Sequence, residues 1–109
     1  MDTKILPADM RVVIIEDEPD SALVINTTLQ IAGAQTWVTN TAEEGLLLLG
    51  EVAPNLLLID LALPLMDGWS FIQHVRSDPR FAQIPAVAIA ETRRDRIEKL
   101  GHRFARHQV

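Results

Sequence analysis

Two apolar segments that run directly into carboxylates constrain this chain more than any other feature. Val12–Ile15 is followed at once by Glu16 and Asp17. Leu56–Ile59 is followed in the same way by Asp60. Short aliphatic runs of this kind are typical of strands that are buried on both faces of a parallel sheet. Because open α/β sheets bind ligands at the carboxyl ends of their strands, the three carboxylates converge at one site if the two strands are neighbours.

The three carboxylates suggest a cation site beside a nucleophile. Carboxylates held this close repel one another, and Mg²⁺, which prefers carboxylate oxygens and water, relieves the repulsion. Asp17 is the predicted main ligand, and Glu16 is expected to support it through water. Asp60 can take up a phosphoryl group as an acyl phosphate. Taken singly, each acid is equally consistent with a solvated turn or a helix cap.

Composition limits the classes of protein to which the chain can belong. Its 109 residues, 48% of them hydrophobic, suit one small globular domain. There is no cysteine, which excludes disulfides, thiolate catalysis and cysteine zinc sites. No apolar run approaches the roughly 20 residues of a membrane span, so no membrane association is expected. Residues 1–10 lack the pattern of a secretory signal, which predicts a cytoplasmic protein.

Charge is distributed unevenly along the chain. Residues 1–90 carry four basic and twelve acidic side chains, a net charge of −8. Residues 91–109 carry six basic and three acidic side chains, a net charge of +3. The acidic body would repel nucleic acid, so no nucleic-acid partner is predicted. We interpret the basic tail as a solvated helix face with a frayed end.

Strand and helix patterns alternate along the chain, which predicts a parallel sheet with right-handed crossovers. Residues 1–10 are expected to form a loose arm, and residues 11–109 a single domain. The predicted strands are Arg11–Ile15, Gln35–Val38, Leu56–Asp60 and Ala86–Ala90. The predicted helices are Pro19–Ile31, one that starts near Thr41, Trp69–Arg76 and Thr92–Leu100.

Two segments together suggest a family. Ile14–Pro19 and Leu58–Trp69 supply an acidic pair, an aspartate at a strand end and a Pro-x-x-Asp-Gly loop, in that order. With Ile84-Pro85 as the entry to strand 4, residues 10–91 resemble the receiver domain of bacterial two-component response regulators. The resemblance implies an α/β fold, the flavodoxin-like doubly wound parallel sheet, with strand order 2-1-3-4 and a fifth strand beside strand 4.

The resemblance also implies roles for individual residues. Asp60 would be the phosphoacceptor, with Glu16 and Asp17 as the acid pocket. Asp60 and the backbone carbonyl of Ala62 would complete the Mg²⁺ ligands.

The loop and switch positions match the family only in part. Pro64 would stiffen the loop over the site, and Gly68 would serve the turn into the third helix. Ala90 stands where the family has Ser or Thr, and alanine has no hydroxyl donor. Thr92 would substitute for it only if the strand register shifts. The conformational switch is therefore expected to be weakened or rewired.

The C-terminal end also departs from the family. No Lys-Pro is present, and His107 is a weak equivalent of the lysine. The chain is expected to be truncated before strand 5 and helix 5, which leaves strand 5 missing or irregular. Strand 4 would then be an open edge. Either a homodimer or the tail, folded back as a short irregular strand, would cover this edge.

Three functions are open on this basis. The first is a phosphorelay receiver that takes a phosphoryl group onto Asp60 from a sensor histidine kinase or phosphotransfer protein and signals to a downstream protein. The second is a degenerate receiver that acts as a phosphorylation-independent interaction or dimerisation module, which Ala90 favours. Both are signalling modules rather than enzymes. The third, a small phosphatase, is disfavoured because Ala62 stands where a second acid is expected.

Overall fold

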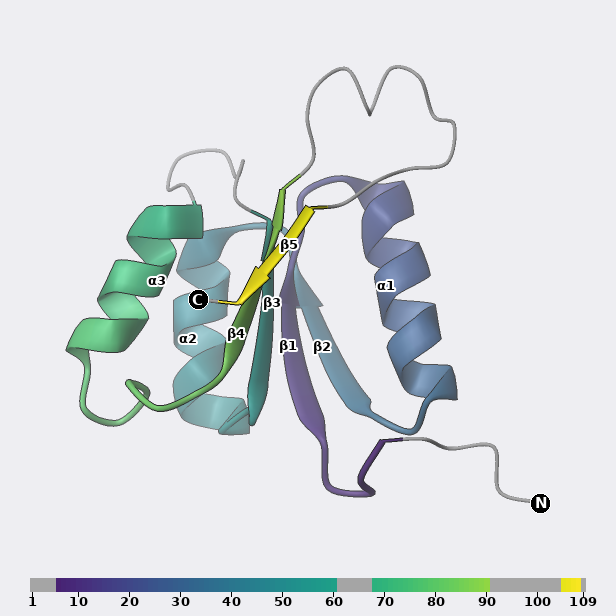
Figure 1. Cartoon of the computed structure of the whole chain (residues 1–109), viewed down its shortest axis with the longest axis horizontal. Helices are drawn as coiled ribbons and strands as arrows, with labels where there is room; N and C mark the ends of the chain where they lie inside the picture. The colour runs from purple at the N-terminus through teal and green to yellow at the C-terminus, as the bar shows by residue number, and fades with distance from the viewer. Residues whose placement is uncertain (1–5, 61–67, 91–104, 109) are drawn as a thin grey trace.

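The computed structural model describes residues 6–60, 68–90 and 105–108, and gives only the backbone of Ala90 and of 105–108 (Figure 1). The strands are β1 (Arg11–Ile15), β2 (Gln35–Thr39), β3 (Leu56–Asp60), β4 (Ala86–Ala90) and β5 (Ala105–Gln108). The helices are α1 (Pro19–Ile31), α2 (Ala42–Val52) and α3 (Gly68–Ser77). The predicted bounds of α1, β1, β3 and β4 are confirmed. β2 is one residue longer than predicted at its C-terminal end, and α3 is one residue longer at each end. The helix predicted over Thr92–Leu100 lies outside the described residues.

The five strands form one sheet in the order β2-β1-β3-β4-β5. The first four are parallel, and Val13 of β1 lies opposite Trp37 of β2 and Leu57 of β3. This arrangement confirms the predicted doubly wound α/β fold with strand order 2-1-3-4. The two central strands, β1 and β3, are therefore direct neighbours. This is the arrangement in which the carboxylates that follow the two strands can meet.

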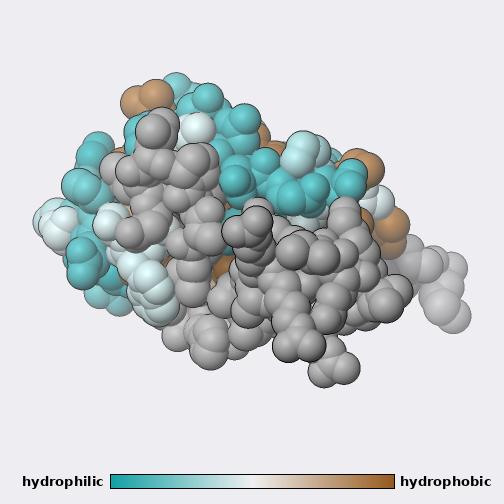
Figure 2. Space-filling view, turned by 90° about the horizontal axis from the view of Figure 1, so that it is seen from above, coloured by the Kyte–Doolittle hydropathy of each residue, from teal (hydrophilic) through white to brown (hydrophobic). Residues whose placement is uncertain are grey.

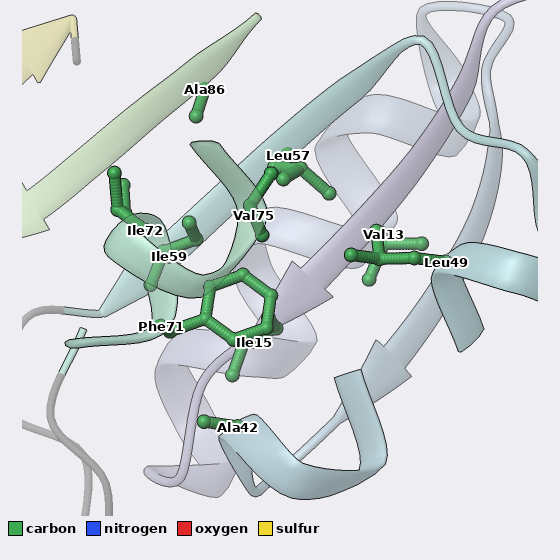
Figure 3. Close-up of a cluster of buried hydrophobic side chains, with 10 residues drawn as sticks. All are labelled: Val13, Ile15, Ala42, Leu49, Leu57, Ile59, Phe71, Ile72, Val75 and Ala86. Atoms are coloured by element: carbon green, nitrogen blue, oxygen red, sulfur yellow. The ribbon is translucent and has the colours of Figure 1, made fainter. Parts of the chain in front are cut away.

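The helices that the structure describes cover the two faces of the sheet unequally. In Figure 1, α1 lies on one face, and α2 and α3 lie on the other. Because successive side chains of a strand point to opposite faces, β1 sends Val12 and Ile14 toward α1 and Val13 and Ile15 toward α2. The larger cluster lies on the α2 and α3 side, where Phe71 packs among the side chains of β1 and β3 (Figure 3).

Local sequence explains where the helices begin and end. The Glu18 side chain accepts a hydrogen bond from the Ser21 backbone N–H at 2.6 Å, and Pro19 follows as the first helical residue of α1. Thr41 caps α2 in the same way, accepting from the Glu44 N–H at 3.2 Å. At the other end of α2, Ala53 adopts a left-handed conformation with φ of 52° and terminates the helix.

The turn after α3 is held by an exposed ion pair. The Asp78 carboxylate accepts from the backbone N–H of Arg80 at 2.9 Å and from its guanidinium at 2.8 Å. The Arg80 side chain is the main reason that the pKa of Asp78 is lowered. Because the pair is solvated, it orders the turn and adds little to the free energy of unfolding.

The part of the expected arm that the structure describes is attached to the domain. The Leu6 N–H donates to the Ala32 carbonyl at 2.9 Å, and the Met10 carbonyl accepts from Gln35 at 2.9 Å. The side chain of Asn55, the residue before β3, accepts from the Arg11 N–H at 2.7 Å and so ties the start of β3 to β1. These contacts lie at the amino ends of the strands, away from the carboxylates.

The end of the sheet differs from the prediction. β5 is present as four residues and runs antiparallel to β4, with Ile89 opposite Arg106 and Ala88 opposite His107. The fifth strand is thus neither missing nor a parallel strand of the family type. Of the two expected covers for the edge of β4, a second copy or the tail folded back as a short strand, the structure has the tail, because β5 pairs with β4 from Val87 to Ala90. An edge row of unpaired backbone groups is costly, and pairing within the chain satisfies it.

Two glycines of α2 test how closely that helix packs. A Cβ added at Gly45 would lie 2.6 Å from Ile15 Cδ1 and 3.3 Å from Phe71 Cε2, whereas one added at Gly50 would meet nothing within 4 Å. We expect Gly50→Ala to raise the free energy of unfolding by about 0.5–1 kcal/mol through helix propensity. Gly45→Ala must displace buried atoms, so we expect it to be at least about 1 kcal/mol less favourable than Gly50→Ala. Urea denaturation measures both variants, and equal effects would contradict this packing.

In the ranges that the structure describes, no helix has the length and apolar character that crossing a membrane requires.

Candidate functional site

Three carboxylates meet at the carboxyl edge of the two central strands. Glu16 and Asp17 directly follow β1, and Asp60 is the last residue of β3. Ile15 lies opposite Ile59 in the parallel pair, so both strands deliver their acids at the same level. Each residue offers a carboxylate oxygen, and these oxygens all lie within 4.8 Å of one another. We call these three residues the acidic cluster.

The acidic cluster is largely withdrawn from solvent. Glu16 is 4% exposed and Asp60 is 2% exposed, while Asp17 is half-buried. The oxygens Glu16 Oε2 and Asp17 Oδ1 are closed off from water. Placing carboxylates together where water cannot solvate them costs free energy that a bound divalent cation offsets. Oxygen donors at this spacing fit a hard cation such as Mg²⁺.

Backbone contacts fix the orientation of the acidic cluster. The Glu16 N–H donates to the Thr39 carbonyl at 3.0 Å, which extends the pairing of β1 and β2 by one residue. Thr39 is itself buried at the end of β2, and its hydroxyl donates to the Thr41 carbonyl at 3.1 Å. The strand predicted from the sequence ended at Val38, so the supporting position of Thr39 was missed. A threonine that ends a strand beside two acidic strand ends is the signal that would have found it.

Glu18 has a different role from the two acids before it. Its carboxylate caps α1, as the simple helix-cap interpretation of the acidic triplet predicted. That interpretation is therefore correct for one residue of the triplet, while Glu16 and Asp17 join Asp60.

The structure describes only some of the other predicted site residues. Gly68 is buried and begins α3, whereas Ala62, Pro64 and Thr92 lie outside the described residues. Asp60 lies opposite Ile89, so Ala90, the last residue of β4, is one position beyond it.

His107, the weak lysine equivalent, lies in β5 opposite Ala88. β4 therefore separates its backbone from that of Asp60. Two strand spacings amount to about 10 Å, which is far for an imidazole to reach.

Figure 2 looks onto this end of the molecule, where the described surface is mainly hydrophilic. Trp69, at the start of α3, is 51% exposed and is the aromatic residue nearest in sequence to the predicted loop.

The fold and the acidic cluster together define a small doubly wound α/β domain with a candidate cation site at the carboxyl edge of its sheet.

Comparison with known proteins identifies the family. The model of the response regulator receiver domain matches residues 12–104. An uncharacterised 14.6 kDa protein of Leptolyngbya boryana is 35% identical over 88 residues, which are 81% of this chain and 67% of that protein. The transcriptional regulator RpaA of Synechocystis is 32% identical over 79 residues, which are 72% of this chain and 33% of RpaA. The chain belongs to the response regulator receiver domain family.

A solved structure supports the same assignment. The phosphorylated cyanobacterial phytochrome response regulator RcpA is 27% identical, with a TM-score of 0.70 over 84% of this chain and 72% of RcpA. The family consists of signalling modules of two-component systems rather than enzymes, and its members interact with sensor histidine kinases and downstream effectors. Because the chain spans about a third of RpaA, activities of that whole protein do not transfer to it.

Proposed function

We propose that this chain is a phosphorelay receiver that accepts a phosphoryl group on Asp60 with the help of Mg²⁺. The observation that carries the proposal is the acidic cluster, with carboxylate oxygens from Glu16, Asp17 and Asp60 all within 4.8 Å of one another. The donor would be a sensor histidine kinase or a phosphotransfer protein, and the recipient of the signal a downstream protein partner. The phosphorylated state of the relative RcpA supports this proposal.

Each residue of the acidic cluster has a distinct task. An Asp60 oxygen forms a bond to phosphorus while the bond between phosphorus and the donor's leaving group breaks. Asp17 and Glu16, fixed by the end of β1, would hold the cation together with Asp60 and the Ala62 carbonyl. When bound, Mg²⁺ screens the carboxylates and the phosphoryl oxygens from one another. The rigid central strands keep these groups in place, which is what in-line transfer requires.

The switch that follows phosphorylation is proposed to be weakened or rewired. Ala90 ends β4 one position beyond the residue opposite Asp60, and alanine offers the phosphoryl group no hydroxyl. This observation favours the second candidate, a degenerate receiver that binds its partner without phosphorylation. The two candidates differ in whether the acidic cluster takes up phosphate at all.

The deciding measurement is intact mass after incubation with acetyl phosphate. We expect a single phosphoryl adduct in the presence of Mg²⁺ and none when EDTA replaces the metal, because the clustered carboxylates would otherwise repel the donor. Circular dichroism confirms that both samples are folded. If folded protein with Mg²⁺ shows no adduct, the phosphorelay proposal fails and the degenerate receiver takes its place.

A further inference from the structure

One edge of the sheet is open. β2 pairs with β1 on one side, and among the described residues no strand pairs with its other side (Figure 1). Alternate residues of a strand present their backbone groups to opposite edges. The Gln35 N–H and the Thr39 carbonyl bond to residues that flank β1, at 2.9 and 3.0 Å, so the backbone groups of Thr36 and Val38 face outward. Each of these two residues offers one N–H and one carbonyl to a further strand.

The sequence of β2 leaves this edge unprotected. Proteins commonly protect an exposed edge strand with a charged residue, a proline or a bulge. Gln35–Thr39 contains neither a charged residue nor a proline, and its threonine, tryptophan and valine residues are of the types that favour strands. Its five residues pair with β1 in continuous register, so there is no bulge either. An edge with these properties is suited to accept another strand.

An open groove lies beside this edge. It has a volume of about 400 Å³, and all of its lining residues belong to β2 or α2, so we call it the β2–α2 groove. Trp37 of β2 and Leu48 of α2 line it and are partly buried. Leu47 also lines it and is 72% exposed, the largest exposed fraction among the described large hydrophobic side chains. A bound apolar side chain would remove this surface from water.

The charged residues that line the β2–α2 groove are both acidic. Glu44 and Glu51 lie seven residues apart on α2, with Leu47 and Leu48 between them in the sequence. At 3.6 residues per turn these positions fall along one stripe of the helix, with the two acids about 10 Å apart. Neither β2 nor α2 contains a basic residue, and within the described part of the chain neither glutamate takes part in an ion pair. The groove is therefore an apolar surface between two carboxylates that have no counter-charge there.

We propose that an extended segment of another protein adds to β2 as a further strand, with an apolar side chain in the β2–α2 groove and a basic side chain facing each of the two glutamates. Main-chain hydrogen bonds would supply affinity, and the groove would supply specificity. Side chains four residues apart in a strand share a face and lie about 13 Å apart, so the matching pattern is basic-x-apolar-x-basic. A second copy of this chain does not fit, because two-fold edge pairing would bring the glutamates of the two α2 helices together.

A titration of the isotopically labelled full chain with a synthetic peptide, followed by NMR, tests the proposal. The probe is the capped peptide Thr-Lys-Thr-Ile-Thr-Lys-Thr, which carries the matching pattern. We expect saturable shifts of the amide signals of β2 and α2 and of the Trp37 indole signal. The same peptide with glutamate in place of lysine should cause shifts at least about fivefold smaller at equal concentration. No shift at millimolar peptide, equal shifts with both peptides, or shifts centred on another face would overturn the proposal.

Two neighbouring glutamates supply a matched pair of variants. Glu44→Lys should weaken binding of the lysine peptide at least about fivefold, because a cation would replace a carboxylate that faces the peptide. Glu43→Lys makes the same change of charge in the same exposed first turn of α2, but Glu43 does not line the groove. It should weaken binding less than about twofold at roughly 0.15 M salt, which screens charges beyond about 8 Å. Equal weakening by the two variants would mean that net charge alone attracts the peptide, and would overturn the proposal.

The same spectra separate this proposal from two other outcomes. Shifts of the β2 signals with protein concentration alone, without peptide, would show that a second copy takes the edge and would overturn the proposal. No phosphoryl donor is present in the titration. The result is therefore independent of whether Asp60 is phosphorylated.

Discussion

Asp60→Asn is expected to abolish phosphoryl uptake from acetyl phosphate while leaving the fold intact. Asparagine keeps the shape of the aspartate side chain at the end of β3, but its neutral amide cannot form the acyl phosphate. The substitution also removes one of the three negative charges from the acidic cluster. Intact mass with Mg²⁺ measures the uptake, and thermal unfolding reports that the variant is folded.

The matched control is Asp20→Asn, which removes one carboxylate from the exposed first turn of α1. It changes the net charge by the same amount and lies outside the acidic cluster, so the adduct should form as in the parent chain. An undiminished adduct in the Asp60→Asn variant would place the phosphoryl group on another residue. Loss of the adduct in both variants would point to total charge rather than to the Asp60 carboxylate.

The central strands and their carboxylates were predictable because local pattern decides them. An apolar run such as Val12–Ile15 is typical of a strand buried on both faces, and acids at the carboxyl ends of two neighbouring parallel strands lie at the same edge of the sheet. The start of α1 was also predictable, because a glutamate cap followed by proline is typical of the first turn of a helix. The support that Thr39 gives to Glu16 could not be predicted, because Thr39 acts through its backbone carbonyl, and every residue has one.

The direction of β5 and the exposure of apolar side chains on α1 depend on long-range packing. Nothing in Ala105–Gln108 distinguishes a parallel from an antiparallel strand, and the free edge of β4 accepts either. Leu23 is an apolar residue of α1, yet the structure leaves it exposed. A pattern shows that a side chain is apolar, but the number of helices on each face of the sheet decides whether it is covered.

Phe71→Ala is expected to lower the free energy of unfolding by about 3–5 kcal/mol, the largest effect on stability that we predict. Phe71 is fully buried and is among the largest side chains of the core. It extends from α3 into the cluster formed by β1, β3 and α2 (Figure 3). A Cβ added at Gly45 would lie 3.3 Å from its ring. Truncation would leave a cavity at the junction of α2, α3 and the sheet, where the rigid central strands cannot close it.

Trp69→Ala provides the control on the same helix. Trp69 lies two residues earlier in α3 and is half-exposed, so its removal should cost clearly less than the loss of Phe71. Urea denaturation monitored by circular dichroism measures both variants, since it does not depend on the tryptophan signal. Equal losses would mean that α3 is held to the domain by its exposed side rather than by Phe71. In that case, β3, the strand that carries Asp60, would not depend on the packing of α3 for its support.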